Sequence, residues 1–388
     1  MRLEDRIDRR RNGRTHRRIV NDLAVLNPTA HLSEPIGRGQ TLERLLDHFD
    51  PVFDGNIPPH GYVHGPKGAG KSAVVTALFE QLSRAGPSPR GAIHTTTRTS
   101  GRPTTSFCYV DARAASTPFG LLHDTLDSLT ELDVPSQGIG VEDLRERLTE
   151  ALSYDHHAVV AVDHVAEADT YPAHEAIDML ASVTPHLSVL AVGRDPPSVV
   201  DSSVETIAVP AYDRHTLVDI LVERASDGIA RSALAHESTT EIASWAEGDA
   251  HDALSALYGA ATLAADDDAE LIDASHVAAG IDAVPEDSCS LGRVLALPET
   301  RQRVLREFVR FTEDERESVT AATAALAHAP SVDLSTATIK RVLYELSDIG
   351  VVRRVADEDS VDGPGRPATR PVPNFPTLVF RHLFDADR

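Results

Sequence analysis

The chain has 388 residues, which is too long for one core of ordinary size and predicts two or three domains. No stretch approaches the roughly 18 uninterrupted apolar residues that a membrane span needs. The amino-terminal residues also lack the apolar centre of a signal peptide, so the sequence predicts a cytoplasmic protein. The two cysteines, Cys108 and Cys289, lie far apart without ligand spacing nearby, which argues against a disulfide framework and a zinc site.

Acidic residues dominate the composition, with 60 Asp and Glu against 37 Lys and Arg and a net charge of -23. Lysine occurs only at Lys67, Lys71 and Lys340. An acidic surface almost without lysine resembles that of proteins from salt-accumulating archaea, although a protein that avoids DNA would also be acidic. Residues 1–18 differ because arginine dominates them, and such a run is either a solvated tail or a nucleic-acid arm.

Short β-branched runs alternate with helical patterns from residue 61 to about residue 209, as a parallel α/β sheet requires. Strands are expected at 61–64, 106–110, 158–162, 188–192 and 205–209. The segment 84–105 is rich in Gly, Pro, Ser and Thr, which predicts an exposed insertion loop.

The pattern becomes helical throughout residues 213–284, and it changes again after Pro285. Helices at 299–311, 314–327 and 336–349 precede a strand at 351–355, a Gly- and Pro-rich tip at 362–367 and a second strand at 369–372. Three helices and a β-hairpin predict a winged helix. The expected domains are a basic arm (1–25), an α/β core (26–209), an α-helical domain (210–285) and a winged-helix domain (290–388).

Residues 65–72 form a complete G-x-x-x-x-G-K-S loop between a predicted strand and a predicted helix at 73–82. Backbone N–H groups around Gly65, Gly68, Ala69 and Gly70 can close around phosphates, and Lys71 neutralises the β/γ charge. Ser72 is placed to hold Mg²⁺. The alternative is a glycine-rich turn with an incidental lysine. The flanking strand and helix favour ATP or ADP with Mg²⁺ as the ligand.

A partner for the metal is expected at the end of another strand. Asp163 directly follows the apolar run 158–162, where it is placed to hold a Mg²⁺-bound water. The alternative is an Asp that merely caps the strand. His164 follows it and occupies the place of a catalytic base.

These features together resemble the archaeal origin-recognition initiator family, AAA+ ATPases related to the eukaryotic origin recognition complex and its helicase-loading partner. The resemblance runs from about residue 26 to the carboxyl terminus and implies an AAA+ core, a helical lid and a winged helix. Its landmarks, in order, are residues 36–45, the phosphate loop, 108–111, 210–213, 248–254 and the winged helix.

The resemblance implies that the side chains at Tyr212, Arg224 and His251 contact the nucleotide. Arg224 shares the apolar face of its helix with Leu217 and Leu221, so its charge needs a partner. Either a phosphate or a core carboxylate would serve.

Four departures from the family pattern affect catalysis. Hydrolytic relatives carry Glu at the place of His164, and the family has Asn where this chain has Arg194 and Arg where it has His251. Residues 197–205 contain no arginine that would serve the ATP of a neighbouring subunit. The resemblance therefore implies a slow or silent ATPase.

The expected helix 336–349 has one apolar stripe, formed by Ile339, Val342, Leu343 and Leu346. The third helix of a winged fold usually reads the major groove of double-stranded DNA, although winged helices also bind proteins. The expected DNA contacts on the helix and the wing are Thr336, Thr338, Lys340, Arg341, Arg353, Arg354, Arg366 and Arg370.

The sequence thus predicts an ATP- and DNA-binding replication initiator, or a paralogue of one, that acts as a nucleotide switch at origin-like sites. The family implies a replicative helicase or other initiator subunits as protein partners. The alternative is a regulatory or signalling P-loop ATPase whose winged helix mediates transcriptional or protein contacts.

Overall fold

The computed structural model describes residues 19–85, 103–130, 134–356 and 369–386. The chain divides into two compact units. The first runs from His31 to Ala211, and the second joins Tyr212–Arg388 to the amino-terminal residues up to Ala30. Within the described ranges, no helix is long and apolar enough to cross a membrane.

The first unit is built on a five-stranded parallel sheet with the order β2-β3-β4-β1-β5. Every residue of β4 is buried, as are most residues of β3, because helices cover both faces of the sheet. The parallel α/β fold predicted from the sequence is confirmed. The strands are β1 (Gly61–His64), β2 (Thr104–Asp111), β3 (His156–Val165), β4 (Leu187–Gly193) and β5 (Glu205–Ala208).

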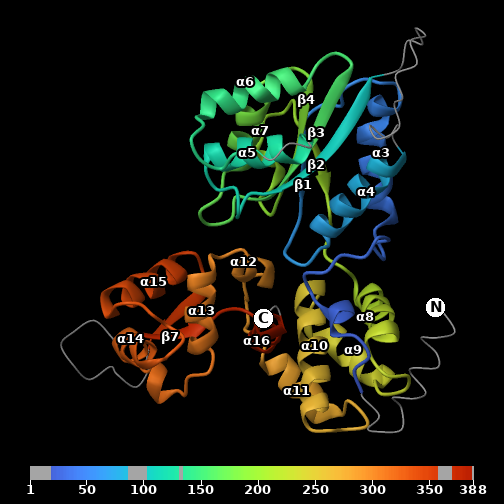
Figure 1. Ribbon diagram of the computed structural model, residues 1–388. Coiled ribbons are helices and arrows are strands. Elements are labelled where there is room, and N and C mark those ends of the chain that lie inside the picture. Colours follow the sequence, from blue (N-terminus) through green and yellow to red (C-terminus); the bar gives the residue numbers. More distant parts are fainter. Residues whose placement is uncertain (1–18, 86–102, 131–133, 357–368, 387–388) are drawn as a thin grey trace, which may run out of the picture. The chain divides into compact units, whose positions relative to one another are not determined.

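Two hydrophobic cores lie on opposite faces of this sheet (Figure 1). One contains side chains of α3 (Gly39–Phe53) and α4 (Lys71–Ala85). The other contains side chains of α5 (Pro118–Leu129), α6 (Val141–Ala151) and α7 (Ala173–Ala181). The first and last residues of the expected insertion loop belong to α4 and β2, and residues 86–102 lie outside the described part.

The second unit contains a helical domain in which three of the four helices, α8, α10 and α11, start at aspartates. Asp213, Asp249 and Asp273 each accept a hydrogen bond from a backbone N–H in the first turn of the following helix, which satisfies a free donor there. The helices are α8 (Arg214–Gly228), α9 (His236–Trp245), α10 (Ala250–Asp266) and α11 (Ala274–Asp282).

The winged helix completes this unit. Gly350, with φ of 76°, ends α15 in a left-handed conformation that glycine adopts without strain. The predicted helices and hairpin are present, whereas α12 and α16 were not predicted and the expected tip at 362–367 lies outside the described residues. The elements are α12 (Leu291–Leu295), α13 (Glu299–Phe308), η3 (Asp314–Arg316), α14 (Val319–His328), α15 (Thr336–Asp348), β6 (Val352–Ala356), β7 (Thr369–Pro373) and α16 (Thr377–Ala386).

A short amino-terminal segment packs on the helical domain. The backbone N–H of Asn21 donates to the carbonyl of Gly228 over 2.9 Å, and Ala230 donates to Ile19 over 2.8 Å. Leu26, at the end of α2 (Leu23–Leu26), is fully buried. Residues 19–25 therefore pack with the helical domain, although the sequence assigned them to the basic arm; residues 1–18 of that arm lie outside the described part.

Replacing Gly228 with Ala should detach this segment. An added Cβ would lie 2.7 Å from Leu26 and 3.0 Å from the carbonyl oxygen of Asp22, so one of them must move. We expect the free energy of unfolding to fall by about 1–3 kcal/mol. The fluorescence of Trp245, the single tryptophan, follows the urea transition of this unit.

The control is Gly39→Ala, because no atom lies within 4 Å of the Cβ that would be added there. It should leave the unfolding transition, followed by circular dichroism, where it is or raise it slightly. Equal transitions for Gly228→Ala and the unmodified protein would show that the segment contributes nothing to stability.

Candidate functional site

The phosphate loop runs from the end of β1 into α4, and its glycines are needed for its shape. A Cβ on Gly65 would lie 2.0 Å from the carbonyl oxygen of Val209, so only glycine fits there. Gly68 and Gly70 have φ values of 67° and 73°, which L side chains rarely adopt. The backbone of the loop therefore has the form that the motif requires.

Two cationic side chains, the buried Arg38 and the half-buried Lys71, donate hydrogen bonds to backbone carbonyls of this loop. Lys71 Nζ donates to the carbonyls of Gly65 and Pro66 over 2.8 and 2.7 Å. Arg38 Nε donates to the carbonyl of Ala69 over 3.0 Å, and its Nη2 donates to Pro210 over 2.9 Å. These contacts of Arg38 were not predicted, because its partners lie 31 and 172 residues away in the sequence.

Asp163, expected to serve the metal, is 1% exposed at the carboxyl end of β3. It accepts hydrogen bonds of 2.6 Å from Tyr109 Oη and from the backbone N–H of His164. Burial opposes ionisation, but the charge of His164 and hydrogen bonds from Ser72, Tyr109 and the His164 N–H outweigh it and lower the pKa of Asp163. The structure thus brings the two expected metal ligands, Ser72 and Asp163, together.

These residues fit a magnesium nucleotide. The loop has no room for a side chain at Gly65, Lys71 lies at its mouth, and an ionised carboxylate lies beside a hydroxyl. Oxygen ligands of this kind are those that Mg²⁺ prefers.

His164, expected to be the base, lies in a bulge between β3 and β4 and has φ of 63°. Its Nε2 is 3.7 Å from Asp163 Oδ2, and its Nδ1 is 3.5 Å from Glu167 Oε1. Both ring nitrogens therefore face carboxylates.

Glu167 is a site residue that the sequence analysis missed. Its side chain is 7% exposed, and Arg194 Nη2 lies 3.2 Å from the same Oε1 that faces His164. Burial opposes its ionisation, but His164, Arg194 and Arg113 overcome this and lower the pKa of Glu167 to about 2. The signal available in the sequence was a charged residue shortly after a fully apolar strand.

Arg113 and Asp111 extend the charged cluster to the next strand. Arg113 Nη2 donates to Asp111 Oδ2 over 2.7 Å, and Arg113 Nε donates to Asp111 Oδ1 over 3.0 Å. Charged groups thus follow β2, β3 and β4, which are neighbours in the sheet. Their carboxyl ends meet at one edge, where open α/β sheets usually bind ligands.

In the second unit, Arg224 is buried and uses backbone partners. Its guanidinium donates to the carbonyls of Val25 and Ala30, and burial lowers its pKa. Its structural partners are thus carbonyl groups rather than the core carboxylate that the sequence allowed. Tyr212 is also buried, and its backbone N–H donates to the carbonyl of Gly248 over 3.2 Å.

His251 has a different surrounding from the one expected. Its Nε2 accepts the backbone N–H of Leu291 over 2.9 Å, which leaves the proton on Nδ1 facing Asp252 Oδ1 at 2.9 Å. Both ring nitrogens are therefore used, although Asp249 and Asp252 lie close enough to resemble a metal site. The side chain ties α10 to the start of α12, and its contact with the nucleotide stays a prediction.

The outward face of α15 carries the expected polar residues. The apolar stripe is buried, whereas Thr336, Lys340, Arg341 and Tyr344 are exposed. Arg354 of β6 lies over the Tyr344 ring, 5.5 Å from its centroid. Thr338 differs from the expectation because its hydroxyl is hydrogen-bonded to the capping residue Ser335 over 2.9 Å.

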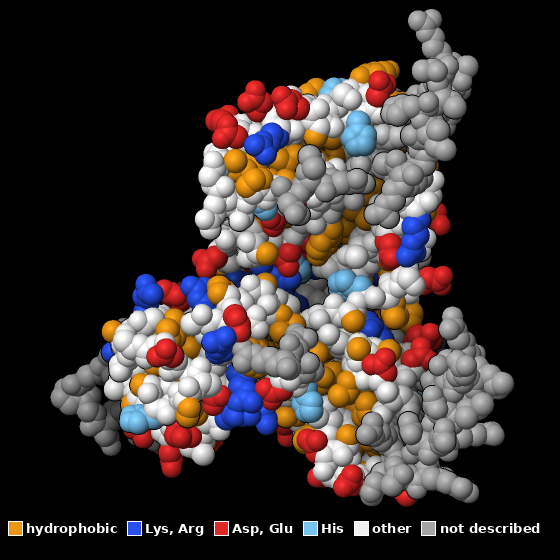
Figure 2. Space-filling model, in the orientation of Figure 1, with side chains coloured by type: hydrophobic (Ala, Val, Ile, Leu, Met, Phe, Trp, Pro, Cys, Tyr) orange, Lys and Arg blue, Asp and Glu red, His pale blue; other side chains and the backbone are white. Residues whose placement is uncertain are grey.

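The remaining expected contacts belong to the wing. Arg353 and Arg354 are neighbours on β6 and point to opposite faces of the hairpin, so only Arg354 stands beside α15. Arg370 lies 4.0 Å from Glu313, and Arg366 lies outside the described residues. On the face shown in Figure 2, Lys and Arg side chains gather over the winged-helix elements.

Residues 34–192 match the family model of the AAA ATPase domain. ORC1-type DNA replication protein 1 of Sulfurisphaera tokodaii is 26% identical over 67% of this chain and 66% of its own length. ORC1-type DNA replication protein 10 of Halobacterium salinarum is 25% identical over 62% of this chain and 60% of its own length. The chain is therefore similar to archaeal ORC1-type proteins over about two thirds of its length. It thus spans just under two thirds of the length of these relatives.

Two solved structures share the fold of this chain. The Aeropyrum pernix ORC1 protein in complex with DNA has a TM-score of 0.60 at 21% identity and covers 95% of this chain and 97% of its own. Cdc6p from Pyrobaculum aerophilum has a TM-score of 0.56 at 18% identity, covering 95% of this chain and 99% of its own. The predicted AAA+ fold is therefore confirmed over nearly the whole chain.

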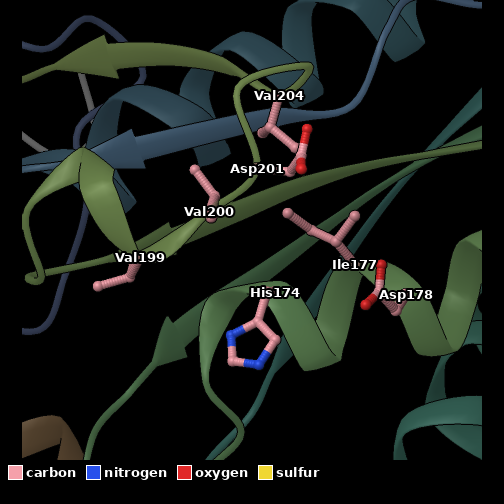
Figure 3. Close-up of a pocket in the computed structure, with 7 residues that line it drawn as sticks. All are labelled: His174, Ile177, Asp178, Val199, Val200, Asp201 and Val204. Atoms are coloured by element: carbon pink, nitrogen blue, oxygen red, sulfur yellow. The ribbon is translucent and has the colours of Figure 1, made fainter.

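Residues 199–204 belong to the stretch that lacks the expected arginine, and four of them line a hollow of about 350 Å³. The hollow lies between α7 and the segment that follows η2 (Pro197–Val199), as Figure 3 shows. The apolar lining consists of Ile177 and three valines at the end of η2 and just after it. The titratable lining residues are His174, Asp178 and Asp201. None of the phosphate-loop residues belongs to it, so it is separate from the nucleotide site.

Proposed function

We propose that this ORC1-type relative is an ATP- and DNA-binding replication initiator, or a paralogue of one, which works as a nucleotide switch with slow hydrolysis. The observation that carries the proposal is the closed phosphate loop next to the ionised, buried Asp163. The winged helix in the same chain supplies a second surface, where basic and aromatic side chains meet.

The ligands of the first site are ATP or ADP with Mg²⁺. The N–H groups of the phosphate loop and Lys71 hold the phosphates, and Ser72 and Asp163 hold the metal or its waters. Bound Mg²⁺ would neutralise phosphate charge. Without nucleotide, Lys71 donates to the carbonyls of Gly65 and Pro66, so it already lies in the loop. It exchanges these carbonyls for phosphate oxygens when nucleotide binds.

Hydrolysis is slow in this proposal because the groups that drive it elsewhere are engaged or missing. His164 faces two carboxylates, and Arg194 faces Glu167. Residues 197–205 offer no arginine to a neighbouring copy, and such an arginine is worth about 10³–10⁵ in rate. The nucleotide then acts mainly by staying bound.

The ligand of the second site is double-stranded DNA at origin-like sequences. An exposed Lys340, Arg341 and Tyr344 lie on one face of α15, with Arg354 stacked on the tyrosine. At molar salt the Debye length is about 3 Å, so close contacts of this kind must supply the affinity of an acidic protein for DNA. Other initiator subunits and a replicative helicase are the protein partners that the family implies.

Lys71→Ala should weaken ADP and ATP binding by at least about 100-fold, because it removes the charge-assisted contacts to the phosphates. Binding is measured by calorimetry with Mg²⁺ at molar salt, alongside turnover of ATP by the unmodified protein. Lys340→Ala, which removes one lysine from α15, is the matched control and should bind nucleotide normally.

We expect the unmodified protein to release phosphate far more slowly than it binds nucleotide. Rapid multiple-turnover hydrolysis that disappears in Lys71→Ala would refute the slow switch. Equal nucleotide affinity in Lys71→Ala and the unmodified protein would remove the phosphate loop from the site.

Arg341→Ala should weaken binding to a specific duplex by about 1–3 kcal/mol if the side chain contacts a base edge. Arg341 Nε lies 3.6 Å from Glu345 Oε1 on the same helix, and its side chain is 71% exposed, so it can turn outward. Anisotropy of labelled duplexes at high salt gives the affinities, with DNA flanking the gene among them.

Arg147→Ala removes an exposed arginine from α6 and serves as the control of equal charge. A loss that is equal for all sequences would make Arg341 a phosphate contact. If no duplex binds at micromolar protein, the initiator function is refuted. The alternative is then a regulatory protein whose winged helix binds another protein.

A further inference from the structure

Glu167 joins two side chains that the family pattern assigns to catalysis. Its Oε1 is 3.5 Å from His164 Nδ1 and 3.2 Å from Arg194 Nη2. Glu167 is 7% exposed, whereas the side chain of Arg194 is 42% exposed. The glutamate is thus the fixed member of the pair and the arginine the movable one.

A strained turn fixes the position of Glu167. His164, Ala166 and Asp169 have φ values of 63°, 60° and 62°, a conformation that is strained for residues other than glycine. The Thr170 hydroxyl contacts the carbonyls of His164 and Glu167 over 3.0 and 2.9 Å and closes the turn. Strain that is maintained next to Asp163 points to a function for the group it positions.

Arg194 lies within reach of the phosphate loop in the same unit. Strand β4 pairs with β1 so that Gly193 is opposite His64, and the loop begins at the next residue, Gly65. Paired strands lie about 4.8 Å apart, so the backbone of Arg194 begins beside the entrance of the loop. The guanidinium therefore has two possible anionic partners, the Glu167 carboxylate and a bound phosphate.

The cost of exchanging these partners is moderate. When Arg194 leaves, Glu167 keeps His164 and the charge of Arg113 nearby, so its buried charge is not left alone. The Arg194 side chain is 42% exposed, so water can solvate its guanidinium when it leaves Glu167. A doubly charged terminal phosphate is a stronger partner for arginine than one carboxylate.

We propose that Glu167 and the γ-phosphate of ATP compete for Arg194, so that Glu167 sets how strongly the site prefers ATP over ADP. This inference rests on the proposed nucleotide binding. With ADP, Arg194 stays on Glu167; with ATP, it turns to the γ-phosphate. Glu167 is a positioning residue in this scheme and does not touch the nucleotide.

A double-mutant cycle tests the competition. Calorimetry gives the affinities for ADP and for a non-hydrolysable ATP analogue, each with Mg²⁺, in the unmodified protein, Glu167→Gln, Arg194→Gln and the double variant. Glu167→Gln should raise the ratio of ATP-analogue to ADP affinity by about fivefold or more, and Arg194→Gln should lower it. In the Arg194→Gln background, Glu167→Gln should change the ratio by less than about twofold.

Several outcomes would overturn the inference. An unchanged ratio in Glu167→Gln, or the same change with and without Arg194, would leave Glu167 a purely structural residue. If Glu167→Gln unfolds, Arg194→Gln still decides, because an unchanged ratio in that exposed variant contradicts the competition. Arg147→Gln is the control for loss of one exposed arginine. Failure of the unmodified protein to bind ADP would instead refute the proposed function.

Discussion

The structure depends on keeping two buried carboxylates ionised at the carboxyl end of β3, between the charged groups that follow β2 and β4. Asp163 is almost fully enclosed, and it stays ionised because Tyr109, Ser72 and the N–H of His164 direct hydrogen bonds at it. Glu167, in the turn that follows β3, is kept ionised by the neighbouring cations. Burying these two charges is unfavourable, and the hydrogen bonds and cations offset that cost only while all of them are in place. The side chains at this edge of the sheet therefore depend on one another.

This coupling explains why an atypical set of residues still makes a coherent site. His164 in place of glutamate and Arg194 in place of asparagine are charged or titratable groups of the opposite sign from the nearby carboxylates. Glu167 supplies the carboxylate that joins them. The substitutions therefore form one network rather than independent losses, and we propose that this network favours holding nucleotide over hydrolysing it.

Local signals predicted much of this molecule. The phosphate loop, Asp163 and the stripe of α15 depend on neighbours in the sequence, and the apolar runs identified all five strands. Glu167 was missed because its position depends on left-handed residues that no pattern marks. The resemblance alone assigned His251 to the nucleotide, and its hydrogen bond from the N–H of Leu291 was not predicted because that residue lies 40 positions away. The packing of residues 19–26 depends on contacts with Gly228 that are equally remote.

Crystal structures with ADP and with a non-hydrolysable ATP analogue, each with Mg²⁺, test the central claim most directly. The account predicts Arg194 on Glu167 in the ADP complex and on the γ-phosphate in the other, with Glu167 and His164 unmoved in both. Arg194 paired with Glu167 in both complexes, or a Glu167 that leaves its turn when ATP binds, would contradict the account.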